Sequence, residues 1–533
     1  MTPTAYPPPP SASSVSPRGG ARRAGMPRGE REVSCFADDD QLRMIVLATS
    51  VATAGLMLPT VRRARSSKLA APAMNLLDQI GRAMSGGGGS DLDLPPLDDR
   101  APAWEELRAQ LDAASTEHER SFRQRVADGS GPEAMALASK RTFDDPAAQP
   151  RVTLYRDTAA WCPYCEKVWL LLEEKRVPYA IEKVNMNCYG EKPEWFWQMQ
   201  PSGGIPVAKV DGQVVRESND IMMAIEGVYA DQRPMLPAAD DPRSARVRPL
   251  LQLERELFSC WFRWLTSGFN NGAQRINFEA TLDAVERELG EGGGPYFLGD
   301  DVTLVDCMFA PFLERMAASL PYYKALPIRR QSRWPNVEAW FVAMEGRPSY
   351  RHIQSDFYTH VHDLPPQIGG CQSVAEAAPY AAAIDGDGGA WELPLPEDDE
   401  HQPLAHLGLA PDAARRQAAE RLLANHAAVV RFAARGAGRP GFPPVSAEFS
   451  DPNATPSEAA VPLVDAALRH VVHALLAGPD AAAATLSPLE PATTVKALGY
   501  LRDRVSVPRD MSYPAARQLR AHLNWMAAAV QPR

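Results

Sequence analysis

The chain has 533 residues and a formal net charge of −10, and 45% of its residues are hydrophobic while 23% are charged. This length exceeds what one ordinary hydrophobic core organises, so the sequence predicts a globular protein of several domains. The acidic balance and the lack of a basic stripe argue against nucleic-acid binding.

The first segment has the composition of a targeting sequence. Residues 1–29 are rich in Pro, Ser and Ala and hold no acidic residue, and their arginines are Arg18, Arg22, Arg23 and Arg28. Arg- and Ser-rich, acid-poor beginnings are typical of organelle transit peptides, so we predict a cleaved targeting segment over residues 1–75. The apolar run 44–59 is shorter than the about 20 residues that a membrane-spanning helix needs, so we expect no stable membrane insertion.

The next segment is expected to be a linker. The stretch SGGGGSDLDLPPLDD, residues 85–99, is flexible and acidic in composition and cannot build a core. Residues 102–127 predict one polar helix whose apolar face carries Trp104, Leu107 and Leu111. We therefore assign residues 76–150 as a linker that carries a polar helix.

Residues 151–232 alternate between strand and helix patterns in the order β-α-β, then β-β-α. A strand over RVTLYRD is followed by a helix over 163–175 and by a second strand over YAIEKVNM. IPVAKVDGQVVRES predicts a hairpin that turns at Asp211-Gly212, and a helix begins at Ser218. This order is that of a thioredoxin-like domain.

The remaining chain has helical patterns. Residues 240–358 predict an all-helical domain, in which Thr303 and Asp306 form the signature of a capping box at the start of an apolar helix. Residues 359–403 are expected to be a linker, and residues 404–533 a helical C-terminal extension. The fold class is therefore α/β plus all-α.

Cys162 and Cys165 lie two residues apart, between a predicted strand and a predicted helix. A thiol attacks only as the thiolate, and a position at a helix N-terminus lowers a cysteine's pKa through the helix dipole and the free N–H groups. Pro163 suits the first position of a helix because its missing N–H would have been unpaired there. Cys165 lies on the same helical face and could resolve a mixed disulfide formed on Cys162.

Other interpretations of this cysteine pair stay open. The seven cysteines are odd in number and widely spread, which indicates a reducing compartment rather than a disulfide scaffold. Two inert core thiols are one alternative, and half of a zinc site is another. A zinc site would need a second Cys/His pair at ligand spacing, so no metal is expected. A [2Fe–2S] cluster held between two such sites is a minor alternative.

The Cys162-Pro-Tyr-Cys165 motif resembles the active site of dithiol glutaredoxins, and residues 152–360 resemble glutathione transferases, most closely the cysteine-dependent omega-like class. The segments that carry this resemblance are KPEWFWQMQPSGGIPV, VVRESNDIM and YFLGDDVTLVDCMFAPFLERM. The whole chain also resembles plastid-type transferase-like proteins of plants and algae through HVHDLPPQIGG and VSVPRDMSYPAARQLRAHL. The expected location is therefore the chloroplast, with the mitochondrion or cytoplasm as alternatives.

The resemblance implies a glutathione site. Pro206 would be a cis proline, and the backbone of Ile205 would pair with the cysteinyl part of glutathione. Glu217 and Ser218 would hold the γ-glutamyl end at a helix start, and Lys192 would lie near the glycyl carboxylate.

The resulting hypothesis is a glutathione-dependent thiol-disulfide oxidoreductase with Cys162 as nucleophile. Its substrates would be small-molecule or protein disulfides, or dehydroascorbate, with glutathione as cosubstrate. Omega-type enzymes have one active-site cysteine, so Cys165 opens a dithiol route beside the monothiol one. The alternatives are a transferase or isomerase acting on apolar electrophiles, and a binding module of transferase fold. A dimer is one option for the assembly.

Overall fold

The computed structural model describes residues 94–532, except 128–130, 132, 144, 146, 270, 397–401, 403–408 and 446. The predicted targeting segment 1–75, with its apolar run 44–59, lies outside the described residues. Within the described part of the chain, no helix is both long enough and apolar enough to cross a membrane.

The thioredoxin-like domain is built on one mixed sheet of five strands. These are β1 (Lys140–Arg141), β2 (Val152–Asp157), β3 (Tyr179–Val184), β4 (Val207–Val210) and β5 (Gln213–Arg216). Their order is β1-β3-β2-β4-β5, with β2 and β3 parallel and the other neighbours antiparallel. Asp211 and Gly212 have φ angles of 50° and 81°, as a tight hairpin turn requires, so the predicted hairpin is confirmed.

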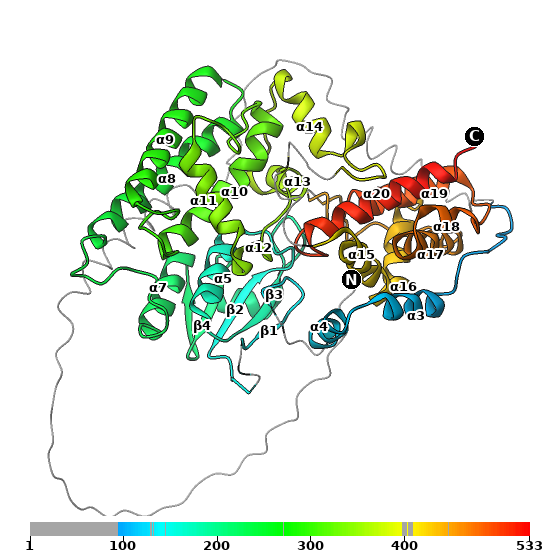
Figure 1. The fold of residues 1–533 in the computed structure, drawn as a ribbon, viewed down its shortest axis with the longest axis horizontal. Coiled ribbons are helices and arrows are strands. Elements are labelled where there is room, and N and C mark those ends of the chain that lie inside the picture. Colours follow the sequence, from blue (N-terminus) through cyan, green and yellow to red (C-terminus); the bar gives the residue numbers. More distant parts are fainter. Residues whose placement is uncertain are drawn as a thin grey trace, which may run out of the picture. The chain divides into compact units, whose positions relative to one another are not determined.

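Helices pack on both faces of this sheet, since side chains of β2 belong to two separate buried clusters, and Figure 1 shows α5 and α7 beside the strands. They are α5 (Pro163–Lys175), α6 (Glu194–Met199) and α7 (Ser218–Val228). α5 and α7 contact each other and the strands. Phe196 of α6 packs with Tyr155, Val184 and Val207 in a separate small core. The sheet is thus buried on both sides. This packing holds the C-terminal end of β2 in place, and the cysteine motif follows that end.

A helical domain follows, with α8 (Ser244–Thr266), α9 (Asn271–Gly292), α10 (Leu304–Lys324), α11 (Pro335–Glu345) and α12 (Pro348–Arg351). α10 is almost entirely buried and contacts α5, α8 and α13. Its capping box is confirmed, because Asp306 accepts hydrogen bonds from the backbone N–H and the hydroxyl of Thr303, both at 2.8 Å. The same carboxylate accepts from Phe297 N at 3.2 Å and Trp340 Nε1 at 3.0 Å.

The segment expected to be a linker, 359–403, is largely structured. It contains most of α13 (Phe357–Ile368) and all of α14 (Ala378–Ile384). The pair Pro365-Pro366 lies in the last turn of α13, and Gly369 ends that helix in a left-handed conformation. The helix forms because Val361 and Leu364 are fully buried against the core.

The C-terminal extension consists of α15 (Pro411–Ala424), α16 (His426–Ala433), α17 (Val461–Ala477), α18 (Pro479–Ala483), α19 (Pro491–Arg502) and α20 (Tyr513–Ala529). The polar helix predicted upstream is two helices, α3 (Trp104–Ala114) and α4 (Glu117–Ala127). α3 packs on α15 and α17, with Leu107 and Leu111 buried as predicted. Trp104 Nε1 donates to Asp465 at 2.9 Å. The predicted linker region therefore supplies part of the extension's core.

Candidate active site

The two motif cysteines lie at the start of α5. Cys162 is the N-cap residue and Pro163 the first helical residue, as the sequence predicts. The Cys162 Sγ lies 3.9 Å from the carbonyl oxygen of Ile205. Cys165 N and Glu166 N both bond to the Cys162 carbonyl, at 3.1 and 3.0 Å, which fixes the first turn. Cys162 therefore lies at a helix N-terminus and beside the loop before β4.

Cys165 lies deeper than Cys162, with 1% of its surface exposed. Burial raises the pKa of the Cys165 thiol well above its ordinary value, and the neighbouring Cys162 and Asp157 add to this effect. Cys165 is therefore a thiol rather than a thiolate at neutral pH. If Cys165 attacked a mixed disulfide formed on Cys162, a neighbouring group would have to accept the proton of the Cys165 thiol.

Asp157, at the end of β2, is a candidate for that acceptor. One of its carboxylate oxygens accepts a hydrogen bond from Trp161 N at 2.5 Å, and the other is buried with no hydrogen-bond partner. Ligand atoms of Asp157, Cys162 and Cys165 all lie within 4.8 Å of one another. A closed structural zinc site takes four ligands, and no fourth such residue joins this group among the described residues.

The residues assigned to glutathione by resemblance lie around Cys162. The Ile205–Pro206 bond is cis, which confirms the expected geometry. Glu217 is the N-cap of α7 with a φ of 62°, unusual for a residue other than glycine, and Ser218 begins the helix and is buried. The backbone N–H groups at this helix start are suited to a carboxylate.

Lys192 is also near the reactive thiol. Its Nζ donates to Asn187 Oδ1 at 2.5 Å, and the side chain is mostly buried. Burial lowers the pKa of Lys192, while the thiols of Cys188, Cys162 and Cys165 act in the opposite direction. The structure thus brings Cys162, Ile205 and Lys192 into one neighbourhood.

Lys167 is a buried cation that the sequence analysis missed. Its Nζ donates to Asn219 Oδ1 at 2.5 Å, on the first turn of α7. Burial and the nearby Arg255 lower the pKa of Lys167 to about 7, against the opposing charges of Cys162 and Glu217. Lys167 therefore links the reactive thiol to the helix start that carries Ser218. A charged pair, Glu166 and Lys167, directly before the apolar run 168–172 was the available signal.

Comparisons with known proteins agree with this architecture. A thioredoxin-like domain joined to a helical domain is the architecture of a glutathione transferase fold. The family model of the glutathione S-transferase N-terminal domain matches residues 161–227, and that of the C-terminal domain matches residues 244–343.

Several known proteins are similar to part of this chain. Glutathione S-transferase DHAR2 of Arabidopsis thaliana is 31% identical over 199 residues, which are 37% of this chain and 86% of the relative. DHAR3, chloroplastic, of the same plant is 28% identical, over 39% of this chain and 75% of the relative. Glutathione S-transferase omega-1 of Sus scrofa is 24% identical, over 44% of this chain and 94% of the relative. The chain belongs to the glutathione S-transferase family. Its relatives support a glutathione-dependent redox or transferase activity.

Proposed function

We propose that this protein is a glutathione-dependent thiol-disulfide oxidoreductase in which Cys162 is the nucleophile. The observation that carries the proposal is the place of Cys162, at the N-terminus of α5 and 3.9 Å from the Ile205 carbonyl beside cis Pro206. A cysteine at this position forms a mixed disulfide with glutathione. It leaves no serine or tyrosine hydroxyl to activate glutathione for conjugation.

Glutathione would lie along the loop before β4 and the start of α7. The backbone of Ile205 would pair with its cysteinyl part, and Glu217 and Ser218 would hold the γ-glutamyl end. Lys192 would face the glycyl carboxylate. The exposed Glu217 and the buried Ser218 at one helix start, with a buried lysine across Cys162, support this orientation.

The reaction would proceed in two displacements. The Cys162 thiolate attacks the glutathione sulfur of a mixed disulfide, the substrate thiolate leaves and takes a proton, and Cys162 is glutathionylated. A second glutathione thiolate then attacks that sulfur, so that glutathione disulfide leaves and the Cys162 thiolate returns. The burial and raised pKa of Cys165 favour this monothiol route over attack by Cys165.

We propose small glutathione mixed disulfides and dehydroascorbate as substrates, and the plastid as the location. The composition of residues 1–29 supports a transit peptide, and the chloroplastic Arabidopsis relative supports a plastid. A fluorescent fusion of the full chain in plant cells tests the location, and cytosolic fluorescence alone would contradict it.

The test of function is glutathione-dependent reduction of a small glutathione mixed disulfide. Cys162→Ser should abolish turnover, while Cys165→Ser should retain most of it. Cys371→Ser is the matched control, because Cys371 is a half-buried thiol outside the site. Loss in both Cys162→Ser and Cys165→Ser would replace the monothiol route by a dithiol one. Wild-type protein that binds glutathione without turnover would contradict the oxidoreductase proposal and favour a binding module.

A further inference from the structure

One arginine of the helical domain contacts the chain on both sides of the cysteine motif. The Arg315 guanidinium donates to the carbonyl of Trp161, the residue before Cys162. It also donates to the carboxylate of Glu166, just after the motif, at 2.9 Å, and it lies 4.5 Å over the Trp161 ring. Arg315 is 1% exposed. The loop that presents Cys162 is therefore fixed from α10.

A second contact reaches the same loop from α13. Trp161 Nε1–H donates to His360 Nδ1 at 3.1 Å, and His360 Nε2 lies 2.6 Å from Glu314 Oε1. Because Nδ1 accepts, the ring proton is on Nε2 and is donated to Glu314. The imidazole is neutral in this arrangement, which agrees with a pKa that burial lowers well below its ordinary value. His360 therefore orients the Trp161 side chain.

The charges in this cluster balance. Burial raises the pKa of Glu166 to about 8 and that of Glu314 to about 7, with Arg315 as the opposing cation. Two carboxyls with raised pKa values thus lie beside one guanidinium, so the cluster can carry little net charge. A cluster without net charge is what a buried site tolerates, so this contact is built to persist in the folded protein.

The C-terminal extension fixes the helix that carries His360. Arg520 of α20 pairs with Asp356, the N-cap of α13, at 2.6 Å, and both side chains are fully buried. Val507 N donates to the hydroxyl of Thr359 at 3.0 Å. Both contacts lie within the first turn of α13, next to His360. The position of the histidine therefore depends on the extension.

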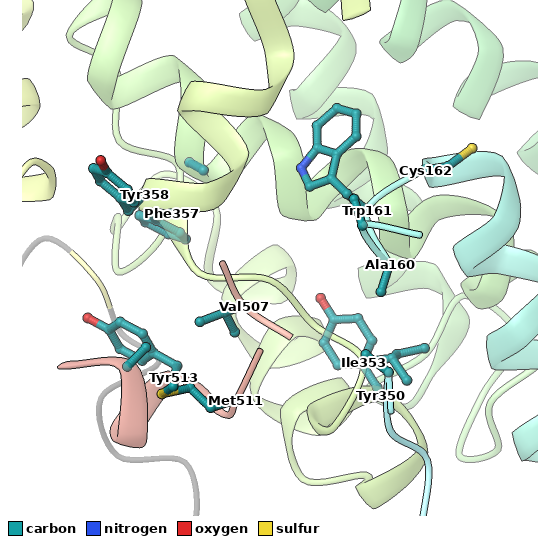
Figure 2. Packing of buried hydrophobic residues seen from close by; sticks show 14 of the residues in the cluster. Ala160, Trp161, Cys162, Tyr350, Ile353, Phe357, Tyr358, Val507, Met511 and Tyr513 are labelled. Atoms are coloured by element: carbon teal, nitrogen blue, oxygen red, sulfur yellow. The ribbon is translucent and has the colours of Figure 1, made fainter. Parts of the chain in front are cut away.

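Apolar packing joins the same three parts of the chain. Figure 2 shows side chains of the cysteine loop, of the segment around α13 and of the extension in one buried cluster, among them Ala160, Trp161, Cys162, Tyr350, Ile353, Phe357, Tyr358, Val507, Met511 and Tyr513. Polar and apolar contacts thus run continuously from α20 to the residue before Cys162.

We propose that the C-terminal extension positions the reactive thiol, by holding α13 so that His360 fixes Trp161 and, with Arg315, the backbone before Cys162. His360 and Arg315 are positioning residues, since neither touches the sulfur. The physical reason is that the orientation of Cys162 relative to α5 affects the stability of its thiolate. N–H groups at a helix N-terminus stabilise a thiolate only when its sulfur is held beside them, so a loop that lets Cys162 rotate away from the start of α5 weakens this effect. The inference rests on the proposed function for the identity of the reacting group.

The test is the rate of alkylation of Cys162 by iodoacetamide across pH, followed by mass spectrometry in the full-length protein. His360→Leu removes both hydrogen bonds and should displace the rate profile to higher pH. A displacement of about one pH unit corresponds to about tenfold slower alkylation at neutral pH. His360→Gln should restore the wild-type profile, because an amide can accept from Trp161 and donate to Glu314. A Leu variant whose profile overlays the wild type would overturn the proposal.

A second set of variants tests the extension. Arg520→Lys should move the alkylation profile in the same direction as His360→Leu. If Arg520→Lys does not fold, Thr359→Val is used in its place, because it removes only the hydrogen bond from Val507 N. The matched control is Arg469→Gln, since Arg469 of the extension pairs with Asp465 and with the upstream Asp99 and makes none of the contacts to α13 given above. A control that moves the profile as much as Arg520→Lys would overturn positioning through α13.

The readout separates this inference from the proposed function. Lys167, Lys192, Asp157 and Cys165 face Cys162 in every variant, so a displaced profile indicates a change in position and not the loss of a titrating neighbour. Alkylation needs neither glutathione nor a disulfide. A protein without glutathione-dependent turnover that still shows the displaced profile contradicts the proposed function and supports the positioning.

Discussion

Replacing Arg520 with methionine should destabilise the protein strongly. Arg520 and Asp356 are both fully buried and pair at 2.6 Å, and Arg520 also donates to the Val505 carbonyl at 2.8 Å. The guanidinium lies 4.6 Å over the Tyr358 ring and 4.8 Å over the Trp391 ring. Methionine keeps the apolar stem but leaves the Asp356 carboxylate buried without a cation.

The expected magnitude follows from that unpaired charge. Breaking a buried ion pair by removing one partner typically costs about 3–5 kcal/mol, because the remaining charge stays desolvated. Asp356→Asn should cost a similar amount, since it leaves the guanidinium unpaired, although asparagine can still cap α13 at Thr359 N. The double variant Arg520→Met, Asp356→Asn should cost much less than the sum of the two.

Urea unfolding of the three variants measures this coupling. The midpoint should fall in both single variants and partly recover in the double variant. Arg431→Met is the control, because Arg431 forms an exposed pair with Glu458 and its loss should leave the midpoint unchanged. A single-variant loss below about 1 kcal/mol, or strict additivity in the double variant, would refute the assignment of a buried, coupled ion pair.

Three further changes have defined outcomes. Burial opposes the charge of His362, but hydrogen bonds to its two carboxylate partners outweigh it and raise the His362 pKa to about 9 from an ordinary 6.5. The contribution of His362 to stability is therefore complete below about pH 6.5 and is lost as pH rises through about 9. His362→Gln should therefore weaken the dependence of the urea-unfolding midpoint on pH across this range. A wild-type unfolding midpoint that rises with pH across this range would contradict the predicted sign of the pH dependence. Asp306→Ala leaves buried donors unpaired and should cost at least about 3 kcal/mol, measured by urea unfolding, and a loss under about 1 kcal/mol would contradict it. Asp157→Asn keeps an acceptor for the backbone but removes the carboxylate beside Cys165, so the minor dithiol reaction, release of glutathione from glutathionylated protein by Cys165 when no free glutathione is present, should slow about 100-fold in stopped-flow traces. An unchanged release rate would exclude Asp157 as the proton acceptor.

Local signals in the sequence predicted much of the thioredoxin-like domain. Asp211-Gly212 specifies a tight turn through its backbone preferences, and Thr303 with Asp306 specifies a helix start, so both features are present as predicted. Pro163 after Cys162 likewise marked the start of α5 correctly. These features depend on residues fewer than five positions apart, which is the range over which a sequence pattern is informative.

The buried polar network could not be predicted in this way. Arg315 and Glu166 are 149 positions apart, and Trp161 and His360 are 199 apart, so no local pattern joins them. One indirect signal existed. Glu314 and Arg315 interrupt an otherwise apolar helix, and adjacent charges on a fully buried helix require partners elsewhere in the fold.

The short strand β1 affects where a fragment of this protein can begin without exposing the edge of the sheet. Lys140 and Arg141 pair with β3, and Ser139 O accepts from Ile181 N at 2.8 Å, so this upstream segment covers the outer edge of the sheet. Arg141 is also paired with the buried Glu173. A fragment beginning at Val152 would leave β3 as an open edge, able to pair with other chains and aggregate. Fragments intended to represent the catalytic core should therefore retain residues upstream of Ser139.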